Sequence, residues 1–314
     1  MPVEPQNALL IHNPRAGNGG RRRTLDEARR ILAAGGIATE LAETGGPGHA
    51  TELAAHAGAR GHGLVIVCGG DGTLNEAVNG LAAQEDGRRV PLGLLPGGTA
   101  NVLAKELGIP WNLPRAAQKL LRCRPQEIAL GLATPLAQAE KKRYFISVAG
   151  AGPDGMIVYS LDPALKARVG ILAYWFEGLR QAVRYRFPKL RISSREQQLE
   201  ATIIIVGRTK HYGGPFQITT GADLREDCFE LVALTSQSGV RYFSYLPVLW
   251  FGDLRRSKGV HFWKSDTVLC EPAGKEPVYA QVDGEALARL PVEFRIVPRA
   301  LTLLMPPREE QGTA

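Results

Sequence analysis

The chain has 314 residues, of which 44% are hydrophobic and 22% charged, as expected for a globular protein with room for two domains. Its formal net charge of +7 favours an acidic partner, such as a nucleotide phosphate, an anionic lipid surface or a nucleic acid. Its apolar runs are too short to span a bilayer, no signal-peptide pattern opens the sequence, and its four cysteines lack the spacing of a zinc site or a disulfide framework. We therefore expect a cytoplasmic protein and, since no nucleic-acid module is evident, no nucleic-acid partner.

The first predicted unit is a strand, a glycine-rich turn and a helix. An apolar strand at residues 8–11 leads into the turn Asn13-Pro14-Arg15-Ala16-Gly17, and a helix follows to about residue 34. That helix opens with the basic run 21–23, although the positive end of a helix dipole disfavours arginine. These arginines become favourable if the turn holds a polyphosphate, and the alternative is a solvated basic face.

The second strand, at residues 37–41, is followed by Thr44, which would lie at the carboxyl edge where open α/β sheets bind ligands. A helix is expected at residues 51–59. The next strand, residues 65–68, runs into Gly69-Gly70-Asp71-Gly72 and then a helix that continues to about residue 81, with Thr73 as its expected cap.

The turn between residues 65–68 and that helix has the character of an anion site. Glycines let backbone N–H groups approach a ligand, and the N-terminus of a helix favours phosphate. Asp71 would repel phosphate unless a divalent cation lies between them or the carboxylate handles a proton on an attacking hydroxyl. The alternative is a tight turn with an Asx-type cap.

Strand, glycine-rich turn and helix occur once more, as strand 91–95, turn 96–101 and helix 102–107. Such alternation predicts a parallel sheet whose turns share the carboxyl edge. The motifs of P-loop enzymes, dinucleotide dehydrogenases and α/β-hydrolases are missing from the sequence.

Strands dominate the second half of the chain, after a helix at residues 114–121. Many short strands with little helix between them predict an antiparallel sandwich or barrel-like domain. An aromatic-rich amphipathic stretch at residues 166–187 and an apolar run at 242–251 are candidates for membrane attachment and for lining an acyl channel, with ordinary packing as the alternative for both. The tail after Pro306 is polar, and we expect it to be disordered. The expected strands are 144–149, 190–192, 201–206, 217–219, 229–235, 259–263, 267–270, 278–282, 292–297 and 301–304.

The turns carry a family resemblance, and two later motifs extend it over nearly the whole chain. The chain resembles the diacylglycerol kinase catalytic domain family, particularly bacterial lipid kinases of the YegS/DgkB type, which are related to sphingosine and ceramide kinases. The matching motifs are Asn13-Pro14-x-x-Gly17-x-Gly19, Gly69-Gly70-Asp71-Gly72-Thr73-x-Asn75-Glu76, Leu95-Pro96-Gly97-Gly98-Thr99-x-Asn101, Gly152-Pro153-Asp154-Gly155 and Val282-Asp283-Gly284-Glu285.

The resemblance implies an α/β nucleotide-binding domain at residues 1–131, completed by about 299–306, and a β-rich lipid-substrate domain at 132–298. It implies that Glu285 is the general base and that Asp71 lies beside the metal–phosphate cluster, with ATP and Mg²⁺ as cofactors. A structural Mg²⁺ would be held by the Asp227 carboxylate with carbonyls near Leu224 and Phe229. The implied nucleotide-binding residues are Asn13, Pro14, Arg15, Ala16, Gly17, Thr44, Gly69, Gly70, Asp71, Gly72, Thr73, Leu74, Asn75 and Thr99.

Two positions depart from the bacterial pattern: Val102 stands where many members have Asp, and Cys228 replaces a frequent glycine. For Asp283-Gly284, the sequence alone favours a type I′ hairpin turn, which is compatible with a base at Glu285. Asp154 would lie in a loop, where it caps the chain or contacts the lipid head or the metal site.

The leading hypothesis is an ATP-dependent kinase acting on a diacylglycerol-like or sphingoid lipid taken from a membrane surface. The stretch around Leu172, Trp175, Phe176 and Leu179, with the positive net charge, would support peripheral attachment to the inner face of the membrane. A homodimer is left open. The alternatives are an NAD kinase-like phosphotransferase with a soluble substrate and a non-catalytic regulator that binds lipid or nucleotide.

Overall fold

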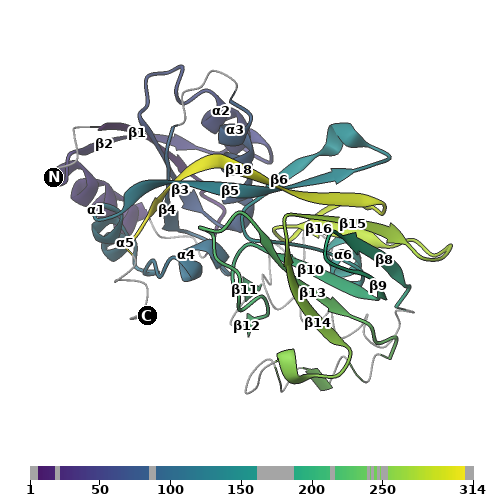
Figure 1. Cartoon of the computed structure of the whole chain (residues 1–314). Helices are drawn as coiled ribbons and strands as arrows, with labels where there is room; N and C mark the ends of the chain where they lie inside the picture. The colour runs from purple at the N-terminus through teal and green to yellow at the C-terminus, as the bar shows by residue number, and fades with distance from the viewer. Residues whose placement is uncertain are drawn as a thin grey trace. The chain divides into compact units, whose positions relative to one another are not determined.

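The computed structural model (Figure 1) describes residues 6–17, 22–84, 90–160, 187–212, 216–238 and 254–307, together with Arg241, Ser244, Tyr245 and Val248. Stretch 166–187 lies outside the described residues except for Phe187, as do most of run 242–251 and the tail from residue 308. The chain divides into two compact units, unit 1 (residues 1–128 and 299–314) and unit 2 (residues 129–298). Among the described residues, no helix is both long and apolar enough to cross a membrane.

Unit 1 alternates strands and helices around a parallel sheet. The sheet runs in the order β2-β1-β3-β4, all neighbours parallel, and the end of β18 (Val292–Met305) adds a further parallel strand beside β4. The predicted α/β fold of this half is therefore confirmed. Its other elements are β1 (Gln6–His12), α1 (Arg22–Ala34), β2 (Ile37–Glu43), α2 (His49–Ala55), β3 (Leu64–Gly69), α3 (Asp71–Ala82), β4 (Leu92–Pro96), α4 (Val102–Glu106) and α5 (Leu113–Leu120).

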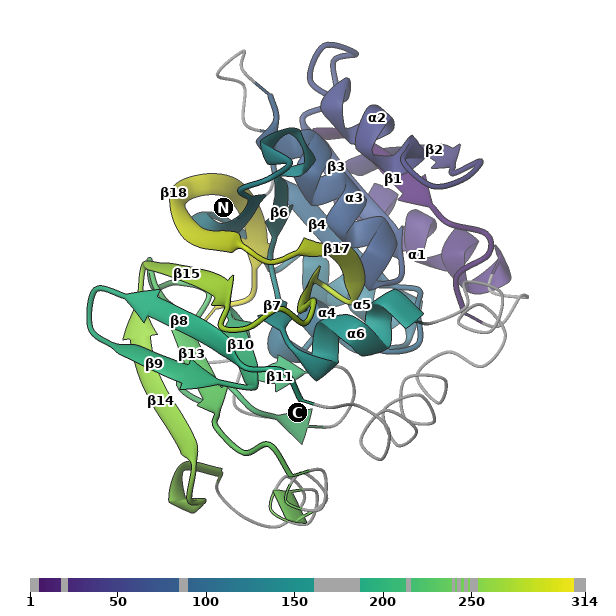
Figure 2. The ribbon, with the colours of Figure 1, turned by 90° about the vertical axis from the view of Figure 1, so that its right-hand side faces the viewer.

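The helices of unit 1 cover both faces of this sheet. Every residue of β3 is buried, which is typical of a parallel strand with helices on either side. From β1 the chain crosses one way to β2, and from β2 it crosses back to β3 and on to β4. Right-handed crossovers in opposite directions place α1 on one face and α2 and α3 on the other. Figure 2 shows α2 and α3 side by side, as their contacts confirm.

The direction of winding reverses between β1 and β3, which are neighbours in the sheet. Open α/β sheets bind ligands at the carboxyl ends of strands at such a switch point, since the connections that leave the two strands part there. The turns after β1 and β3 therefore occupy the position that the topology alone assigns to a ligand.

Two sequence expectations in unit 1 were wrong in detail. Helix α3 begins at Asp71 with Gly70 as its N-cap, so Thr73 lies inside the first turn. Gly70 has the extended backbone conformation of an N-cap residue, and that role had been expected of Thr73. Helix α2 runs from His49 to Ala55 rather than from residue 51 to 59, and turns follow it from His56 onward.

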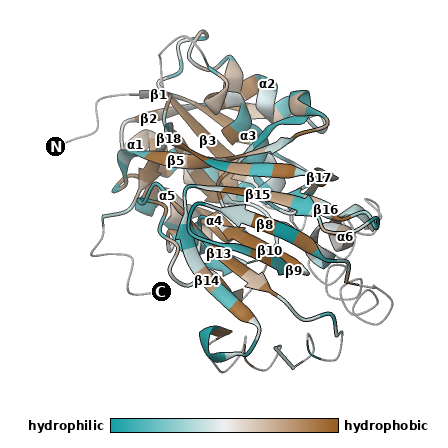
Figure 3. Ribbon diagram, turned by 45° about the vertical axis from the view of Figure 1, so that its right-hand side comes forward, coloured by the Kyte–Doolittle hydropathy of each residue, from teal (hydrophilic) through white to brown (hydrophobic). Residues whose placement is uncertain are grey.

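Unit 2 is an antiparallel sandwich, as predicted. One sheet runs β14-β13-β10-β7-β16-β17, and a second set of strands pairs β9 with β8, β8 with β15 and β15 with β18. In Figure 3 the central strand β10 is mostly hydrophobic, whereas the edge strand β14 alternates. The elements are β5 (Arg124–Pro135), β6 (Arg143–Phe145), β7 (Val148–Ala151), α6 (Pro153–Ser160), β8 (Leu190–Ser194), β9 (Gln198–Ala201), β10 (Ile203–Gly207), β11 (His211–Tyr212), β12 (Phe216–Gln217), β13 (Phe229–Leu234), β14 (Val260–Ser265), β15 (Thr267–Pro272), β16 (Tyr279–Val282) and β17 (Glu285–Arg289), with short 3₁₀ turns at Ala139–Lys141 and Leu254–Arg256.

The core of unit 2 is built from the inward faces of its strands. Phe145, Phe229 and Phe294 are fully buried, and the Phe145 ring lies 5.6 Å from the Phe229 ring and 6.2 Å from the Phe294 ring, centroid to centroid. Aromatic pairs at these separations stabilise a core beyond the burial of their area. The three residues belong to β6, β13 and β18, so the aromatic cluster joins strands that are distant in sequence.

Several elements of unit 2 differ from the sequence expectations, and the expected strand 144–149 is divided into β6 and β7. Residues 153–160 form helix α6, so Asp154 is helical and not in a loop. Strand β5 was not anticipated, because its first four residues are polar or proline and largely exposed. Strand β18 is one continuous element, although its sequence suggested two strands, 292–297 and 301–304.

Candidate active site

The turn after β1 is fastened to the turn after β3. The Asn13 backbone N–H donates to the Cys68 carbonyl (3.0 Å), and its side-chain amide donates to Thr73 Oγ1 (2.9 Å). Asn13 Oδ1 accepts from the Arg15 N–H (3.0 Å), so the side chain also shapes its own turn. The Asn13 side chain thus joins two of the three predicted phosphate-binding turns. Pro14, Arg15 and Gly17 are exposed beside it, and Ala16 is half-buried.

The turns after β3 and β4 are in direct backbone contact. The Gly97 N–H donates to the Gly69 carbonyl (2.9 Å), and a Cβ placed on Gly98 would lie 2.4 Å from the Gly70 Cα. Real Cβ atoms do not approach a backbone carbon so closely, so only glycine fits at position 98 without moving the turn. Glycine is therefore required here for the approach of two turns to each other.

Asp71 holds the third turn in place. Its Oδ1 accepts a hydrogen bond from the Val102 N–H (2.7 Å) at the start of α4. Next to it, Asn101 adopts a left-handed conformation (φ 47°) and exchanges two side-chain hydrogen bonds of 2.9 Å with the Gly98 backbone. Residue 102, where many family members have Asp, thus contacts Asp71 through its backbone N–H.

Burial raises the pKa of Asp71 above its ordinary value of 3.8, and the hydrogen bond from the Val102 N–H opposes that rise. Lys105, one turn along α4, has its pKa lowered by burial, while the charge of Asp71 acts in the opposite direction. A carboxylate and an ammonium group in a partly desolvated setting are the type of pair that functional sites contain.

Among the remaining nucleotide candidates, Thr44, Gly72 and Thr99 are at least partly accessible, whereas Leu74 and Asn75 are buried. Thr44 follows β2, its N–H donates to the His12 carbonyl (2.8 Å), and Thr99 is exposed in the turn after β4. Gly72 is half-buried in the first turn of α3, which carries no side-chain cap within the described residues. Leu74 and Asn75 are buried, so they support α3 from within. The backbone donors at the N-terminus of α3 face the edge shared by the turns.

A small cavity of about 10 Å³ lies behind the turns, lined by Gly70, Asp71, Asn101 and apolar side chains of β3 and β4. This volume is close to that of a single water-sized sphere. The cavity therefore has no room for a nucleotide.

In unit 2, Asp283 and Gly284 form the predicted two-residue hairpin turn between β16 and β17. Both have positive φ angles, 46° and 80°, as a type I′ turn requires. The Asp283 carboxylate accepts three backbone N–H bonds of 3.0 Å each, from Ile146, Ser147 and Val148. Asp283 is thus a structural residue that ties the hairpin to β7 and the residues before it.

Glu285 follows this turn and forms an ion pair with Arg143. Glu285 Oε2 lies 2.8 Å from Arg143 Nη1, and each side chain is about one third exposed, at 35% and 36%. The carboxylate is therefore accessible to a substrate, and the guanidinium fixes its orientation. Arg143 was not identified from the sequence, because nothing in its local pattern indicates a partner 142 residues away.

The residues implied for a structural Mg²⁺ do not fit that ion. The Leu224 carbonyl accepts from Arg208 Nη2 (2.9 Å), and the carbonyls on either side of Asp227 accept from Arg208 Nη1. The Asp227 carboxylate is exposed, and Phe229 is a fully buried residue at the start of β13. Among the described residues, no group of three or more His, Cys, Asp or Glu side chains is arranged to hold a metal.

Two family models match the sequence. The diacylglycerol kinase catalytic domain matches residues 7–133, and the YegS C-terminal NAD kinase beta sandwich-like domain matches residues 147–305. Together they cover both units.

Relatives and solved structures agree with these matches. The chain is 28% identical to a diacylglycerol kinase of Bacillus subtilis (strain 168), over 96% of this chain and 97% of that protein. It is 29% identical to a diacylglycerol kinase of Staphylococcus haemolyticus (strain JCSC1435), over 95% and 88%. A crystal structure of a diacylglycerol kinase from Bacillus anthracis str. Sterne has the same fold, with a TM-score of 0.76, 24% identity and coverage of 96% of this chain and 98% of that chain.

Proposed function

The chain belongs to the family of lipid kinases built on the diacylglycerol kinase catalytic domain, and we propose that it transfers the γ-phosphoryl group of ATP to the hydroxyl group of a membrane lipid. The relatives named above are diacylglycerol kinases, so diacylglycerol is the first acceptor to test, and a sphingoid lipid is the second.

The observation that carries this proposal is the joining of three glycine-rich turns in unit 1. Asn13 bonds Thr73, Gly98 contacts Gly70, and Asp71 bonds the Val102 N–H. Phosphoryl transfer depends on positioning and charge neutralisation more than on covalent chemistry. Backbone N–H groups of these turns and the N-terminus of α3 provide both for the phosphates of a nucleotide.

The turn set also fits a metal-bound nucleotide. When bound, Mg²⁺ would neutralise charge on the phosphates. Asp71 supplies a carboxylate at this edge, and we propose it as the residue that would hold the cation. Residues Asn13 to Gly17, Thr44, Gly69 to Asn75 and Thr99 are the nucleotide-binding residues we propose.

For the acceptor, Glu285 is the general base that we propose in unit 2. An ionised carboxylate accepts the proton of a lipid hydroxyl as its oxygen attacks phosphorus. Arg143 holds Glu285 through the 2.8 Å ion pair, and the Asp283-Gly284 turn fixes the backbone before it. In this proposal Asp283 is needed for the geometry of the turn and not for proton transfer.

The test is phosphorylation of lipid by the purified protein. We would incubate it with labelled ATP, Mg²⁺ and a total lipid extract, and identify the labelled product by mass spectrometry. Wild-type protein should label a lipid hydroxyl. Glu285→Gln should abolish labelling while nucleotide binding persists. Glu200→Gln is the matched control, since Glu200 pairs with Lys189 at the surface of the same unit.

One observation keeps a second function in the test. The family model for residues 147–305 describes an NAD kinase-like sandwich, which favours a phosphotransferase with a soluble acceptor as the alternative. NAD is therefore included as an acceptor in the same assay. If NAD becomes labelled and no lipid does, the soluble-acceptor function replaces the lipid kinase proposal.

A further inference from the structure

Arg208 is the largest fully buried side chain of the described residues, with 0% exposure at the end of strand β10. Its guanidinium donates four hydrogen bonds to backbone carbonyls and binds no carboxylate directly within the described part of the chain. Nη1 donates to Glu226 (2.5 Å) and Cys228 (2.7 Å), and Nη2 donates to Leu224 (2.9 Å) and Ala129 (3.1 Å). Three of these carbonyls belong to the turn that precedes β13.

A convergence of backbone carbonyls in a protein interior calls for a cation. Carbonyl oxygens with a nearby carboxylate form the ligand set that hard divalent ions prefer. Here the cation is already part of the chain. Burial lowers the pKa of Arg208 to about 10, so the guanidinium remains charged at neutral pH. Asp223, Glu226 and Asp227 carry negative charge around it.

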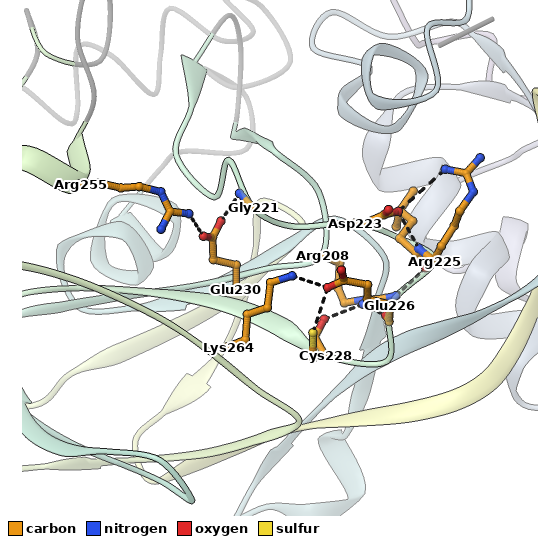
Figure 4. Close-up of polar contacts among 10 residues, drawn as sticks. Arg208, Gly221, Asp223, Arg225, Glu226, Cys228, Glu230, Arg255 and Lys264 are labelled. Carbon is orange, nitrogen blue, oxygen red and sulfur yellow. Dashed lines mark hydrogen bonds and ion pairs between the residues drawn. The ribbon is translucent and has the colours of Figure 1, made fainter. Parts of the chain in front are cut away.

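Asp223 and Glu226 of the turn have side-chain partners other than Arg208. Figure 4 shows Lys264 paired with Glu226, whose carboxylate also accepts from Cys228 Sγ. Asp223 accepts from the Arg225 N–H (2.9 Å) and lies 3.8 Å from the Arg225 guanidinium. Ion pairs of Asp223 and Glu226 therefore hold the side chains of the turn, and Arg208 holds its backbone carbonyls.

We propose that the Arg208 guanidinium is a built-in cation that takes the place of a structural metal ion, so that the turn of residues 223–228 holds its shape without Mg²⁺. The carbonyl of Leu224, which the family resemblance assigns to the metal, is a hydrogen-bond acceptor for Arg208. A divalent cation on the same oxygens would lie beside a positive guanidinium and be repelled by it. Glu226 and Cys228, on either side of the expected ligand Asp227, turn their carbonyls toward Arg208 as well.

Mg²⁺ could act in two ways, in catalysis with ATP and in stabilising the fold of unit 2. Catalysis with ATP requires Mg²⁺ in the proposed function, whereas the fold of unit 2 does not. The test therefore uses thermal unfolding of the full chain without nucleotide, and its result does not depend on whether the protein is a kinase.

The first measurement compares wild-type protein in EDTA with the same protein in excess Mg²⁺. The two melting temperatures should agree, and protein dialysed against a chelator-free buffer should carry no stoichiometric metal by elemental analysis. A melting temperature that falls in EDTA and recovers with Mg²⁺ would overturn the proposal, as would one tightly held divalent ion per chain.

The second measurement removes the guanidinium with Arg208→Ala. The variant should melt several degrees lower than wild type, and free guanidinium ion, well below denaturing concentrations, should raise its melting temperature where an equal concentration of NaCl does not. Arg195→Ala is the matched control, because Arg195 pairs with Asp266 in the same unit but is 75% exposed; its melting temperature should stay close to that of wild type. An Arg208→Ala protein as stable as wild type would contradict the proposal. If that variant does not fold, the EDTA comparison on wild type still decides the question.

Discussion

Asp71 has two roles, one in the fold of unit 1 and one in the proposed phosphate site. Its carboxylate is the acceptor that fixes the start of α4, and it also carries a negative charge within one of the proposed phosphate-binding turns. Burial disfavours its charged form, as its raised pKa shows. Retaining a costly charge where a neutral acceptor would serve the fold is typical of functional residues, which often reduce stability in favour of activity.

Asp71→Asn should therefore separate stability from activity. A carboxyl group whose folded pKa is raised contributes stability that is fully present below its unfolded pKa, near 3.8, and is lost as pH rises through the folded value. Asn keeps an acceptor for the Val102 N–H but does not titrate. The free energy of unfolding of Asp71→Asn, relative to that of wild type, should therefore grow as pH rises from about 3.8. The variant should also be a weaker kinase than wild type. Thermal unfolding across pH measures the stability difference, and a gap that shrinks with rising pH would refute it.

Arg143 is predicted to be a positioning residue for Glu285. Arg143→Ala frees the carboxylate to rotate, so kcat should fall by about 10-fold to 100-fold while KM for ATP changes little. Arg143→Lys retains the charge and should recover part of the loss. Lys189→Ala breaks a 3.2 Å surface ion pair in the same unit and serves as the control. Steady-state kinetics distinguish these outcomes; an Arg143→Ala enzyme with wild-type kcat would exclude the role.

At the scale of elements, the approach of two glycine turns is the feature with the clearest steric demand. Gly98→Ala places a Cβ 2.4 Å from the Gly70 Cα, so the turns must separate. We expect a loss of about 1–3 kcal/mol in stability and a KM for ATP at least about 10-fold higher, a factor equivalent to about 1.4 kcal/mol. Gly63→Ala, at a position with open space around it, is the control. Denaturant unfolding and kinetics give the two readings, and normal values for both in Gly98→Ala would show that the turns need no such contact.

The sequence was sufficient for elements with a strong local pattern and failed where distant contacts decide. The strand–turn–helix units of unit 1 follow from apolar runs punctuated by glycine, and the Asp283-Gly284 hairpin follows from turn chemistry. Helix α6 was missed because Pro153 and Gly155 look like loop residues. Glycine is required at position 155 because a Cβ there would lie 2.0 Å from the Tyr279 carbonyl oxygen, a contact that the sequence does not reveal. Arg208 and Arg143 were missed for the same reason, since their partners come from distant parts of the chain.

At the scale of the whole molecule, the net charge of +7 predicts how the protein reaches a lipid substrate. Binding to vesicles that contain anionic lipid should be measurable by co-sedimentation at low salt, and it should decline as salt shortens the screening length to about 8 Å at physiological ionic strength. Vesicles of neutral lipid alone should bind less at every salt concentration. Equal binding to both vesicle types would show that charge does not direct the association.

The proposed function depends on one edge of unit 1. There the direction of winding in the sheet β2-β1-β3-β4 reverses, and the turns after β1, β3 and β4 contact one another. The residues there supply backbone donors, a helix N-terminus and the half-buried carboxylate of Asp71. The diacylglycerol kinase catalytic domain model matches residues 7–133, a range that contains all three turns.

Hydrogen–deuterium exchange with and without Mg²⁺ and a non-hydrolysable ATP analogue tests that edge most directly. Peptides covering residues 12–17, 69–76 and 96–102 should all gain protection together when the analogue is added, because its phosphates would accept hydrogen bonds from all three turns. Protection confined to one of these peptides, or found only elsewhere in the chain, would contradict the account.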